Sequence, residues 1–329
     1  MFRRHHQGRR HTNIVFVIFR LILSVVMFAI LIGGIYSAYK HFSGLDPLKL
    51  DPQAVVTNLL AARTPKQFIA VFSALKIDPI GTTPGVNTAL FRFLLITDSH
   101  SDNSSLEKAI NQAKNTYPDL KFIIGLGDYS EVGTVAELKN AKTVFDASNI
   151  RYFLIPGDHD LWDCRNRHIE AVSCFEGVFG SSYQSFEFDN FKFLLLDNSD
   201  DYQGFGEAER KWIDSELESI KQSSFKGVLV FLHEPLFHPS SDHVMGKTES
   251  SLKQQARDLM FQLKEAGVKK VFSGDIHYFS EYSEPVTGLP MVTIGATTIE
   301  RNPQVPRFAV VSVSEDGTTK VEDVTILGL

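Results

Sequence analysis

The 329-residue chain has no excess of basic residues, only two cysteines, and neither an internal repeat nor a low-complexity tract. Its 33 Lys and Arg are outnumbered by 39 Asp and Glu, and six of the basic residues but none of the acidic ones lie in the first 40 positions. The remainder therefore holds 27 basic against 39 acidic residues. This balance argues against binding to duplex nucleic acid, which requires a basic face. Two cysteines allow at most one internal disulfide.

One long apolar run lies near the N-terminus. It covers residues 14–36 and is interrupted only by Arg20, Ser24 and the pair Gly33-Gly34. A helix of this length would span roughly 34 Å, enough to cross about 30 Å of hydrocarbon. We therefore predict a single transmembrane helix. The alternative is a cleaved signal peptide, whose apolar region would be unusually long.

The segments on either side of this run set the predicted orientation. Residues 1–13 form a basic tail, which by the positive-inside rule stays in the cytoplasm and places the rest of the chain on the extracytoplasmic side. Residues 37–88 are predicted to be a stalk, and residues 89–329 a folded domain. In an oxidising compartment a disulfide between Cys164 and Cys174 is favoured, and two unpaired thiols are the alternative.

From Phe91 onward, apolar strand-like runs alternate with helical patterns. Helical spacing is found over residues 104–117, 134–147, 206–222 and 249–266. Strand-like runs without helices between them follow at 182–188 and 191–196, and again at 290–294, 308–313 and 321–327. Strand–helix–strand units followed by meander strands predict an α/β domain with a mixed sheet and with helices outside it.

Five short segments each end an apolar run with Asp or His. They are Asp98-Ser99-His100, Gly127-Asp128, Gly157-Asp158-His159-Asp160, His233 and Gly274-Asp275-Ile276-His277. Strand ends of an α/β sheet are where ligand sites form, and divalent metals take carboxylate and imidazole ligands. One such segment arises readily by chance, but five in series do not. Two cations roughly 3.5–4 Å apart need ligands from several loops, so the pattern predicts a two-metal hydrolase.

In order and spacing, these segments over residues 91–280 resemble the motifs of the calcineurin-like metallophosphoesterase family. Those motifs are Asp-x-His, Gly-Asp, Gly-Asn-His-Asp/Glu, a lone His and Gly-His-x-His. The resemblance implies a four-layer α/β/β/α sandwich with two mixed sheets and two metals at the strand ends. It also implies a ligand set: Asp98, His100 and His277 for one metal, Asp128 as the bridge, and Asp158, His233 and Asp275 for the second metal. His159 would be the histidine that assists the leaving group or stabilises the phosphoryl charge.

Two positions depart from the family pattern. Asp158 stands where the family has Asn, and Asp275 stands where it has the first His of Gly-His-x-His. Both supply oxygen ligands, so the second metal position should favour Mn, Mg or Fe over Zn. Four carboxylates would also offset the charge of two divalent metals. Such a centre would attract an anionic phosphate less than the usual family site does. Alternatively, one metal is held weakly, or Asp158 is protonated or hydrogen-bonded instead.

The sequence thus predicts a metal-dependent phosphoesterase that hydrolyses a phosphomonoester or phosphodiester by a metal-bridged hydroxide. Its partners would be a phosphorylated small molecule, nucleotide or lipid as substrate, and the membrane through the N-terminal helix. Two other hypotheses stay open. One is a binding module on a catalytically degenerate phosphoesterase scaffold, and the other is a cation-binding structural domain.

Five residues near the motifs carry weaker predictions. Trp162 would stack on an aromatic group of the substrate, although packing in the core is favoured for it. Arg165 and Arg167 would contact phosphate or be solvated. His238 and His243 lie in the loop that follows His233, and they would either rim the cleft or play no part in it.

Overall fold

The computed structural model describes Met27 and residues 89–328. The predicted tail and stalk lie outside the described residues, as does the predicted membrane helix except for Met27. Within the described part of the chain, no helix combines the length and the apolarity needed to cross a membrane.

The first sheet is mixed and has the strand order β11-β10-β1-β2-β3. Its parallel half consists of β1 (Phe91–Ile96), β2 (Leu120–Gly125) and β3 (Tyr152–Leu154). Its antiparallel half consists of β10 (Arg307–Val313), which pairs with β1, and β11 (Thr319–Thr325), which pairs with β10. The C-terminal meander therefore returns to the strand that opens the domain.

The second sheet is also mixed and has the order β4-β5-β6-β7-β9-β8. Its central strands run parallel: β5 (Phe191–Leu195), β6 (Gly227–Phe231), β7 (Lys270–Ser273) and β9 (Pro290–Thr293). The edge strands β4 (Gln184–Phe188) and β8 (Ser280–Ser283) are antiparallel to their neighbours. The two mixed sheets of the predicted fold are therefore confirmed.

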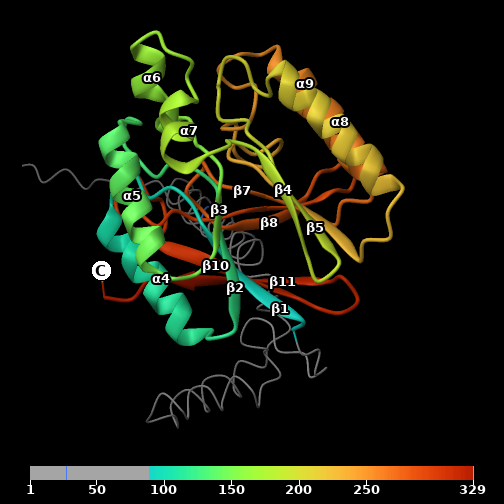
Figure 1. Ribbon diagram of the computed structural model, residues 1–329. Helices are drawn as coiled ribbons and strands as arrows, with labels where there is room; N and C mark the ends of the chain where they lie inside the picture. Colours follow the sequence, from blue (N-terminus) through green and yellow to red (C-terminus); the bar gives the residue numbers. More distant parts are fainter. Residues whose placement is uncertain (1–26, 28–88, 329) are drawn as a thin grey trace, which may run out of the picture. The chain divides into compact units, whose positions relative to one another are not determined.

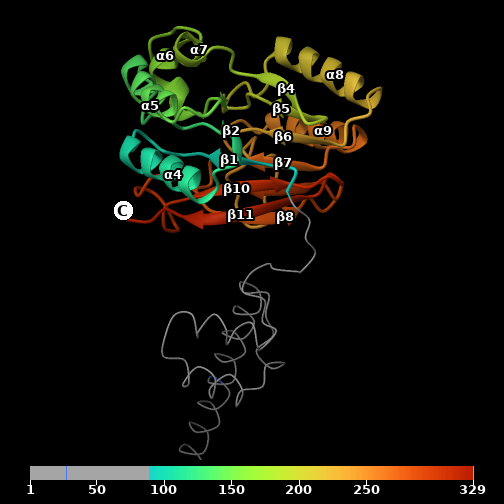
Figure 2. The same ribbon diagram turned by 60° about the horizontal axis from the view of Figure 1, so that its bottom comes forward.

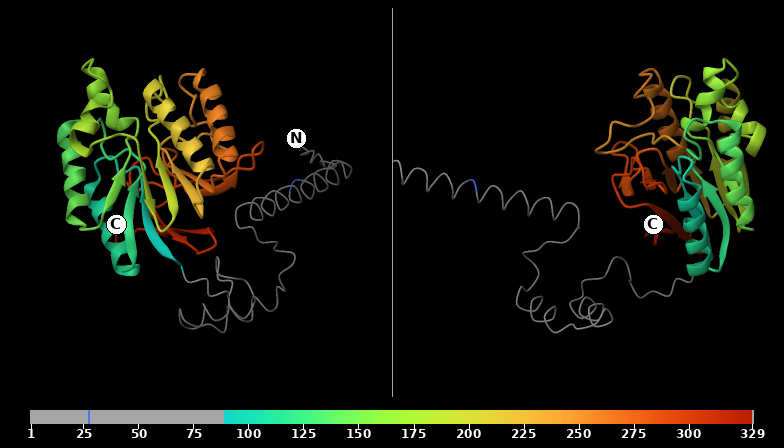
Figure 3. Two further views of the ribbon diagram at one scale, coloured as in Figure 1. Left: turned by 45° about the vertical axis from the view of Figure 1, so that its right-hand side comes forward. Right: turned by 90° about the vertical axis from the view of Figure 1, so that its left-hand side faces the viewer.

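Helices cover the outer face of each sheet (Figures 1 and 2). On the first sheet these are α4 (Asn103–Thr116), α5 (Val135–Ala147) and α7 (Ser173–Phe179), whose buried side chains form one apolar cluster with it. On the second sheet they are α8 (Glu207–Lys221) and α9 (Leu252–Glu265). Figure 3 shows the two helical layers on opposite sides of the strands.

The core between the two sheets is built largely from phenylalanine. Because side chains alternate along a strand, Phe93 and Leu95 of β1 face the second sheet, whereas Leu94 and Ile96 face the helices. The ring of Phe193 on β5 is fully buried and stacks on Phe186, with 4.6 Å between ring centroids. The order of layers is therefore helix, sheet, sheet, helix.

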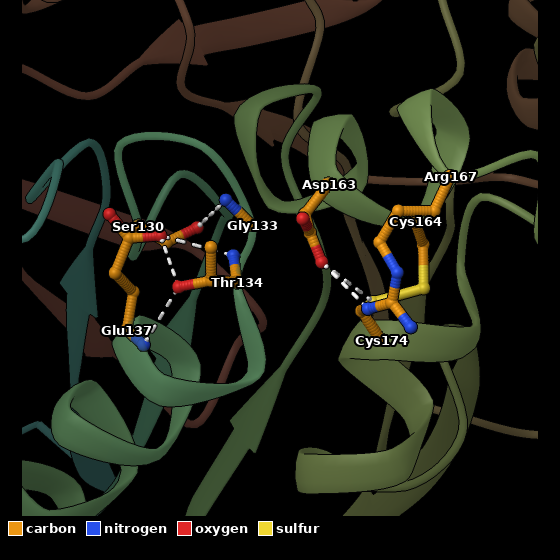
Figure 4. The surroundings of a disulfide bond; sticks show 8 residues. All are labelled: Ser130, Gly133, Thr134, Glu137, Asp163, Cys164, Arg167 and Cys174. Atoms are coloured by element: carbon orange, nitrogen blue, oxygen red, sulfur yellow. Dashed lines mark hydrogen bonds and ion pairs between the residues drawn. A yellow bond between two sulfur atoms is a disulfide. The ribbon is translucent and has the colours of Figure 1, made fainter.

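Three short elements between β3 and β4 were not predicted from the sequence. They are a 3₁₀ turn (His159–Leu161), α6 (Trp162–Asn166) and α7. Each is too short to show helical periodicity. A disulfide between Cys164 and Cys174 joins α6 to α7, with 5.8 Å between the two Cα atoms (Figure 4). This is the pairing that the sequence favours.

We predict that Phe193→Ala lowers the free energy of unfolding by about 3–5 kcal/mol, because it removes a ring from the centre of the inter-sheet core and leaves a cavity. Phe261→Ala is the matched control, since this α9 side chain is 44% exposed. It should change stability by about 0.5 kcal/mol or less. Urea titrations of the two variants measure both values, and equal losses would contradict the described core.

Candidate metal centre

All five predicted segments lie at the carboxyl ends of strands. Each key residue stands two to four positions beyond its strand: Asp98 after β1, Asp128 after β2, Asp158 after β3, His233 after β6 and Asp275 after β7. The backbone N–H of Asp275 donates to Oδ2 of Asp98 at 3.2 Å, which links the ends of the two sheets. The structure therefore brings residues from both sheets to one place.

Most of these residues have an unusual backbone conformation. Positive φ angles are found at Asp98 (52°), His100 (42°), Asp128 (56°), Asp275 (67°) and His277 (59°). A residue other than glycine adopts this left-handed region at an energetic cost. Such strain persists where surrounding contacts enforce it, and it concentrates at functional sites. Here the N–H of His100 donates to the carbonyl of Asp128 at 2.9 Å and helps to hold both turns.

One group of potential metal ligands consists of Asp98, His100, Asp128 and His277, whose ligand atoms all lie within 4.8 Å of one another. Nε2 of His100 is 3.5 Å from Oδ2 of Asp128 and 3.1 Å from Nε2 of His277. Nε2 of His277 is 3.8 Å from Oδ1 of Asp98. These four side chains point their donor atoms at a common point.

A second group consists of Asp128, Asp158 and His233, again within 4.8 Å. Nε2 of His233 lies 3.6 Å from Oδ1 of Asp128 and 3.5 Å from Oδ1 of Asp158. The same nitrogen lies 3.9 Å from Oδ1 of Asp275. Asp128 belongs to both groups, the position that a bridging carboxylate needs.

Backbone carbonyls fix the imidazoles of three histidines. Nδ1 of His233 lies 2.7 Å from the carbonyl of Leu126, and Nδ1 of His277 lies 3.0 Å from that of Arg301. Nδ1 of His159 makes the same type of contact, at 2.6 Å, with the carbonyl of Glu131. Since a carbonyl only accepts, each Nδ1 carries the hydrogen, and Nε2 of the neutral ring keeps its lone pair. This orientation prepares a histidine for metal binding.

Several buried polar atoms at this point have no hydrogen-bond partner among the described residues. They include Oδ1 of Asp98, Oδ2 of Asp275 and Nε2 of His233. A buried acceptor without a donor costs roughly 1–3 kcal/mol, and an ion is one recognised explanation for such atoms. Two divalent cations, one bound by Asp98 and the other by His233 and Asp275, would satisfy all three acceptors. The residues present therefore fit a pair of divalent metals.

The electrostatics of the second group favour added positive charge. Burial raises the pKa of Asp128 well above its ordinary value, and the charge of Asp158 raises it further. Burial likewise raises the pKa of Asp275. Burial alone would lower the pKa of His233, but the surrounding carboxylates, Asp128 first, raise it well above its ordinary value. Burial opposes the charge of Asp158, yet the imidazole of His233 lowers the pKa of this carboxyl to about 2. The pKa shifts of Asp128, Asp275 and His233 thus favour the protonated form of each group, whereas that of Asp158 favours its charged form.

Two supporting residues had no role in the sequence-based prediction, although Asp160 belongs to one of the five segments. Asp160 is fully buried and accepts N–H bonds from Tyr129, Ser130 and Gly157 at 3.0–3.3 Å, which joins the loops after β2 and β3. Asn198 accepts the N–H of His233 at 3.0 Å through Oδ1. A signal did exist for Asn198, because it follows the apolar run of β5 just as the predicted ligands follow theirs.

A cavity of about 760 Å³ opens above the two groups. Its floor includes His100, Asp128, Asp158, Asp275 and His277, and His159 lines it as well. Its walls come from two loops. One is the loop after His233, which was a candidate for the rim of the cleft and carries Ser241 and His243; the other, which was not predicted, carries Ile299, Arg301, Asn302 and Pro303. Arg301 is the only Lys or Arg among these described lining residues, and it forms an ion pair with Glu131.

The weaker candidates divide clearly. The indole of Trp162 stacks on His159, with ring centroids 3.8 Å apart, so it packs against a site residue. Arg165 pairs with Asp200, and Arg167 pairs with Asp163 beside the disulfide (Figure 4); neither arginine lines the cavity. His243 lines it, whereas the buried His238 does not.

Gly157 tests how closely this site is packed. A Cβ atom there would lie 2.1 Å from Oδ1 of Asp128 and 2.7 Å from Cε1 of His233. We predict that Gly157→Ala displaces both side chains, weakens metal binding and costs about 1–3 kcal/mol of stability. Gly177→Ala in α7 is the control: a Cβ there has no neighbour within 4 Å, and it should stabilise the helix by about 0.5–1 kcal/mol. Metal analysis and urea unfolding check both, and normal metal content in Gly157→Ala would contradict the geometry.

Comparison with known proteins identifies relatives of this chain. The family model of calcineurin-like phosphoesterases matches residues 91–279. Serine/threonine-protein phosphatase CPPED1 of Homo sapiens is 28% identical over 224 residues, which cover 64% of this chain and 70% of that protein. A 3′,5′-cyclic-nucleotide phosphodiesterase of Nostoc sp. is 25% identical over 237 residues, or 68% and 84% of the two chains.

Solved structures show the same fold. GAP50, the anchor in the inner membrane complex of Plasmodium, superposes with a TM-score of 0.53 at 16% identity, over 73% of this chain and 86% of that one. Purple acid phosphatase PPD1 from yellow lupin (Lupinus luteus) superposes with a TM-score of 0.53 at 14% identity, over 74% of this chain and 53% of that one. Since the family model covers more than half of the chain and its relatives are phosphatases and phosphodiesterases, this protein belongs to the calcineurin-like phosphoesterase family and is a phosphoester hydrolase.

Proposed function

We propose that the protein hydrolyses phosphoric esters with two divalent metals held at the ends of its two sheets. The ligands are Asp98, His100 and His277 for the first metal, Asp128 for both, and Asp158, His233 and Asp275 for the second. The observation that carries this proposal is the set of buried, unpaired acceptors on Asp98, His233 and Asp275. Their convergence also argues against a degenerate binding module, which has no need of such a costly arrangement.

His159 is the proposed acid in this reaction. When bound, the metals would polarise the phosphoryl group and acidify the attacking water. The chain itself must deliver a proton to the departing alcohol oxygen. Nδ1–H of His159 is engaged by the carbonyl of Glu131, and Trp162 holds the ring from its face. Nε2 is therefore the atom that carries the transferred proton.

The donor atoms favour hard metals at the second position. Three carboxylates surround a single predicted imidazole, that of His233. Oxygen-rich sites suit Mn and Mg better than Zn, and Fe is accepted by mixed carboxylate and imidazole sites. We therefore propose Mn, Mg or Fe as the working metals.

The proposed substrate is a phosphomonoester or phosphodiester of a small molecule, nucleotide or lipid. The cavity of about 760 Å³ falls within the range of small-molecule sites, roughly 300–1,000 Å³. The relatives named above, a protein phosphatase and a cyclic-nucleotide phosphodiesterase, support the chemistry for both ester types. Arg301 at the cavity wall is suited to contact the anionic phosphate.

We also propose that the domain works outside the cytoplasm and is anchored by residues 14–36. Their apolar sequence and the basic residues before them support the anchor and its orientation. The disulfide between Cys164 and Cys174 supports an oxidising compartment, because such bonds are rare in the cytosol.

The enzymatic proposal predicts different defects in two variants of the full chain. Asp128→Asn should lose metal and turnover together, since the bridging carboxylate contributes to both positions. His159→Ala should keep nearly all its metal and lose about 10²–10⁴-fold in kcat, as expected for removal of a general acid. Turnover of monoester and diester panels is measured with Mn, Mg, Fe and Zn, together with metal content. Unchanged turnover in His159→Ala would remove this histidine from the mechanism.

The topology is tested separately in cells that express the full chain. Protease added after removal of any outer barrier should degrade the domain, while a cytoplasmic marker protein stays intact as the control. Alkylation without reduction should leave Cys164 and Cys174 unmodified, and prior reduction should expose both. Full protection from the protease, or two thiols that react without reduction, would overturn the extracytoplasmic assignment.

A further inference from the structure

The second metal position has an unexpected neighbour. Where the family motif has its first His, this chain has Asp275, so the predicted ligands of that position include only one imidazole, that of His233. The structure places Nε2 of His243 3.6 Å from Oδ1 of Asp275, at the edge of the same cavity. We propose that His243 is a ligand of the second metal and supplies the imidazole that position 275 lacks. This inference rests on the two-metal function proposed above.

The distances around Asp275 suit a shared ion. Oδ1 of Asp275 lies 3.6 Å from Nε2 of His243 and 3.9 Å from Nε2 of His233, so both imidazoles flank one carboxylate oxygen. Two donor atoms that each bind an ion at about 2.1 Å stand at most about 4.2 Å apart. Both pairs fall within this limit. His243 lies ten residues after His233, and no motif in the intervening loop marks it as a ligand.

An ion pair with Asp275 explains the position of His243 less well than metal binding does. Its side chain is 50% exposed, and a pair with such exposure contributes little to stability. Asp275 is only 5% exposed; His243 contacts its Oδ1, while its Oδ2 has no hydrogen-bond partner among the described residues. Contact with substrate phosphate is the other possible role, but the carboxylate beside Nε2 repels an anion there. A cation, by contrast, is attracted by both groups.

The loop that carries His243 is already ordered around it. Nδ1 of the buried His238 accepts the N–H bonds of Ser240 and Ser241 at 3.2 and 3.0 Å. The hydroxyl of Tyr278, next to the ligand His277, lies 3.3 Å from Oγ of Ser240. The bonds to His238 hold the loop together, and the contact with Tyr278 ties it to the segment after β7 that bears His277. His243 is thus presented to the site with little reorganisation, a requirement for a precise ligand.

Titration of the metal-free full chain with Mn²⁺ tests the assignment without relying on activity. Free Mn²⁺ is measured by electron paramagnetic resonance. The wild-type chain should bind two equivalents. His243→Ala and His243→Gln should weaken the second equivalent at least about tenfold and leave the first unchanged, which also reports an intact fold. The control is His168→Asn, which removes an exposed imidazole that does not line the cavity and should bind like the wild type.

The double variant His243→Ala/Asp275→His provides the converse test, because it returns an imidazole to the family position. It should recover most of the affinity for the second equivalent. Two equally tight equivalents in His243→Ala would overturn the proposal, whatever the effect on KM. So would an equal weakening of both equivalents, since His243 would then support the fold. If the wild-type chain binds Mn²⁺ as expected but hydrolyses no ester, the enzymatic proposal fails while the ligand assignment stands.

Discussion

Four aspartates meet where the carboxyl ends of two sheets converge, and Asp98, Asp128 and Asp275 are buried there. Carboxylates in such proximity cannot all ionise unless positive charge lies among them. Histidines lie among these aspartates in the ligand groups. The same turns hold left-handed backbone at non-glycine residues. The repulsion between the carboxylates and the strain of the backbone both raise the free energy of the folded site. They persist because the packing of the strands beneath holds the loops in this conformation.

That packing explains why the site depends on the whole domain. Asp98 and Asp128 come from the first sheet, whereas His233 and Asp275 come from the second. The phenylalanine core between the sheets sets the spacing at which they meet. The bond from the N–H of Asp275 to Asp98 then fixes the register of the two halves. Neither sheet alone contains a complete ligand group for two metals. The geometry of the metal ligands therefore depends on the packing of the core.

How much of this the sequence reveals depends on the range of the interaction. A strand end followed by Asp or His is a local pattern, which is why Asp98, Asp128 and His233 were identifiable as candidates. The roles of Asn198 and Asp160 depend on distant partners: Asn198 accepts the N–H of His233, and Asp160 accepts that of Ser130. Their positions after strands are visible in the sequence, but these partners are not. Trp162 stacks on His159, three residues earlier. A spacing of three predicts a side-chain contact only in a helical segment, and the sequence did not predict a helix here.

The two family departures also change how an anionic substrate is attracted. Two divalent cations would be neutralised by four carboxylates, so the centre itself would exert little net pull on a phosphate. The attraction must then come from the cavity wall, where Arg301 is the only Lys or Arg among the described lining residues. Arg301 is paired with Glu131, whose carbonyl holds His159, and its own carbonyl holds His277. Phosphate contact at the wall is therefore tied to both the proposed acid and a proposed metal ligand.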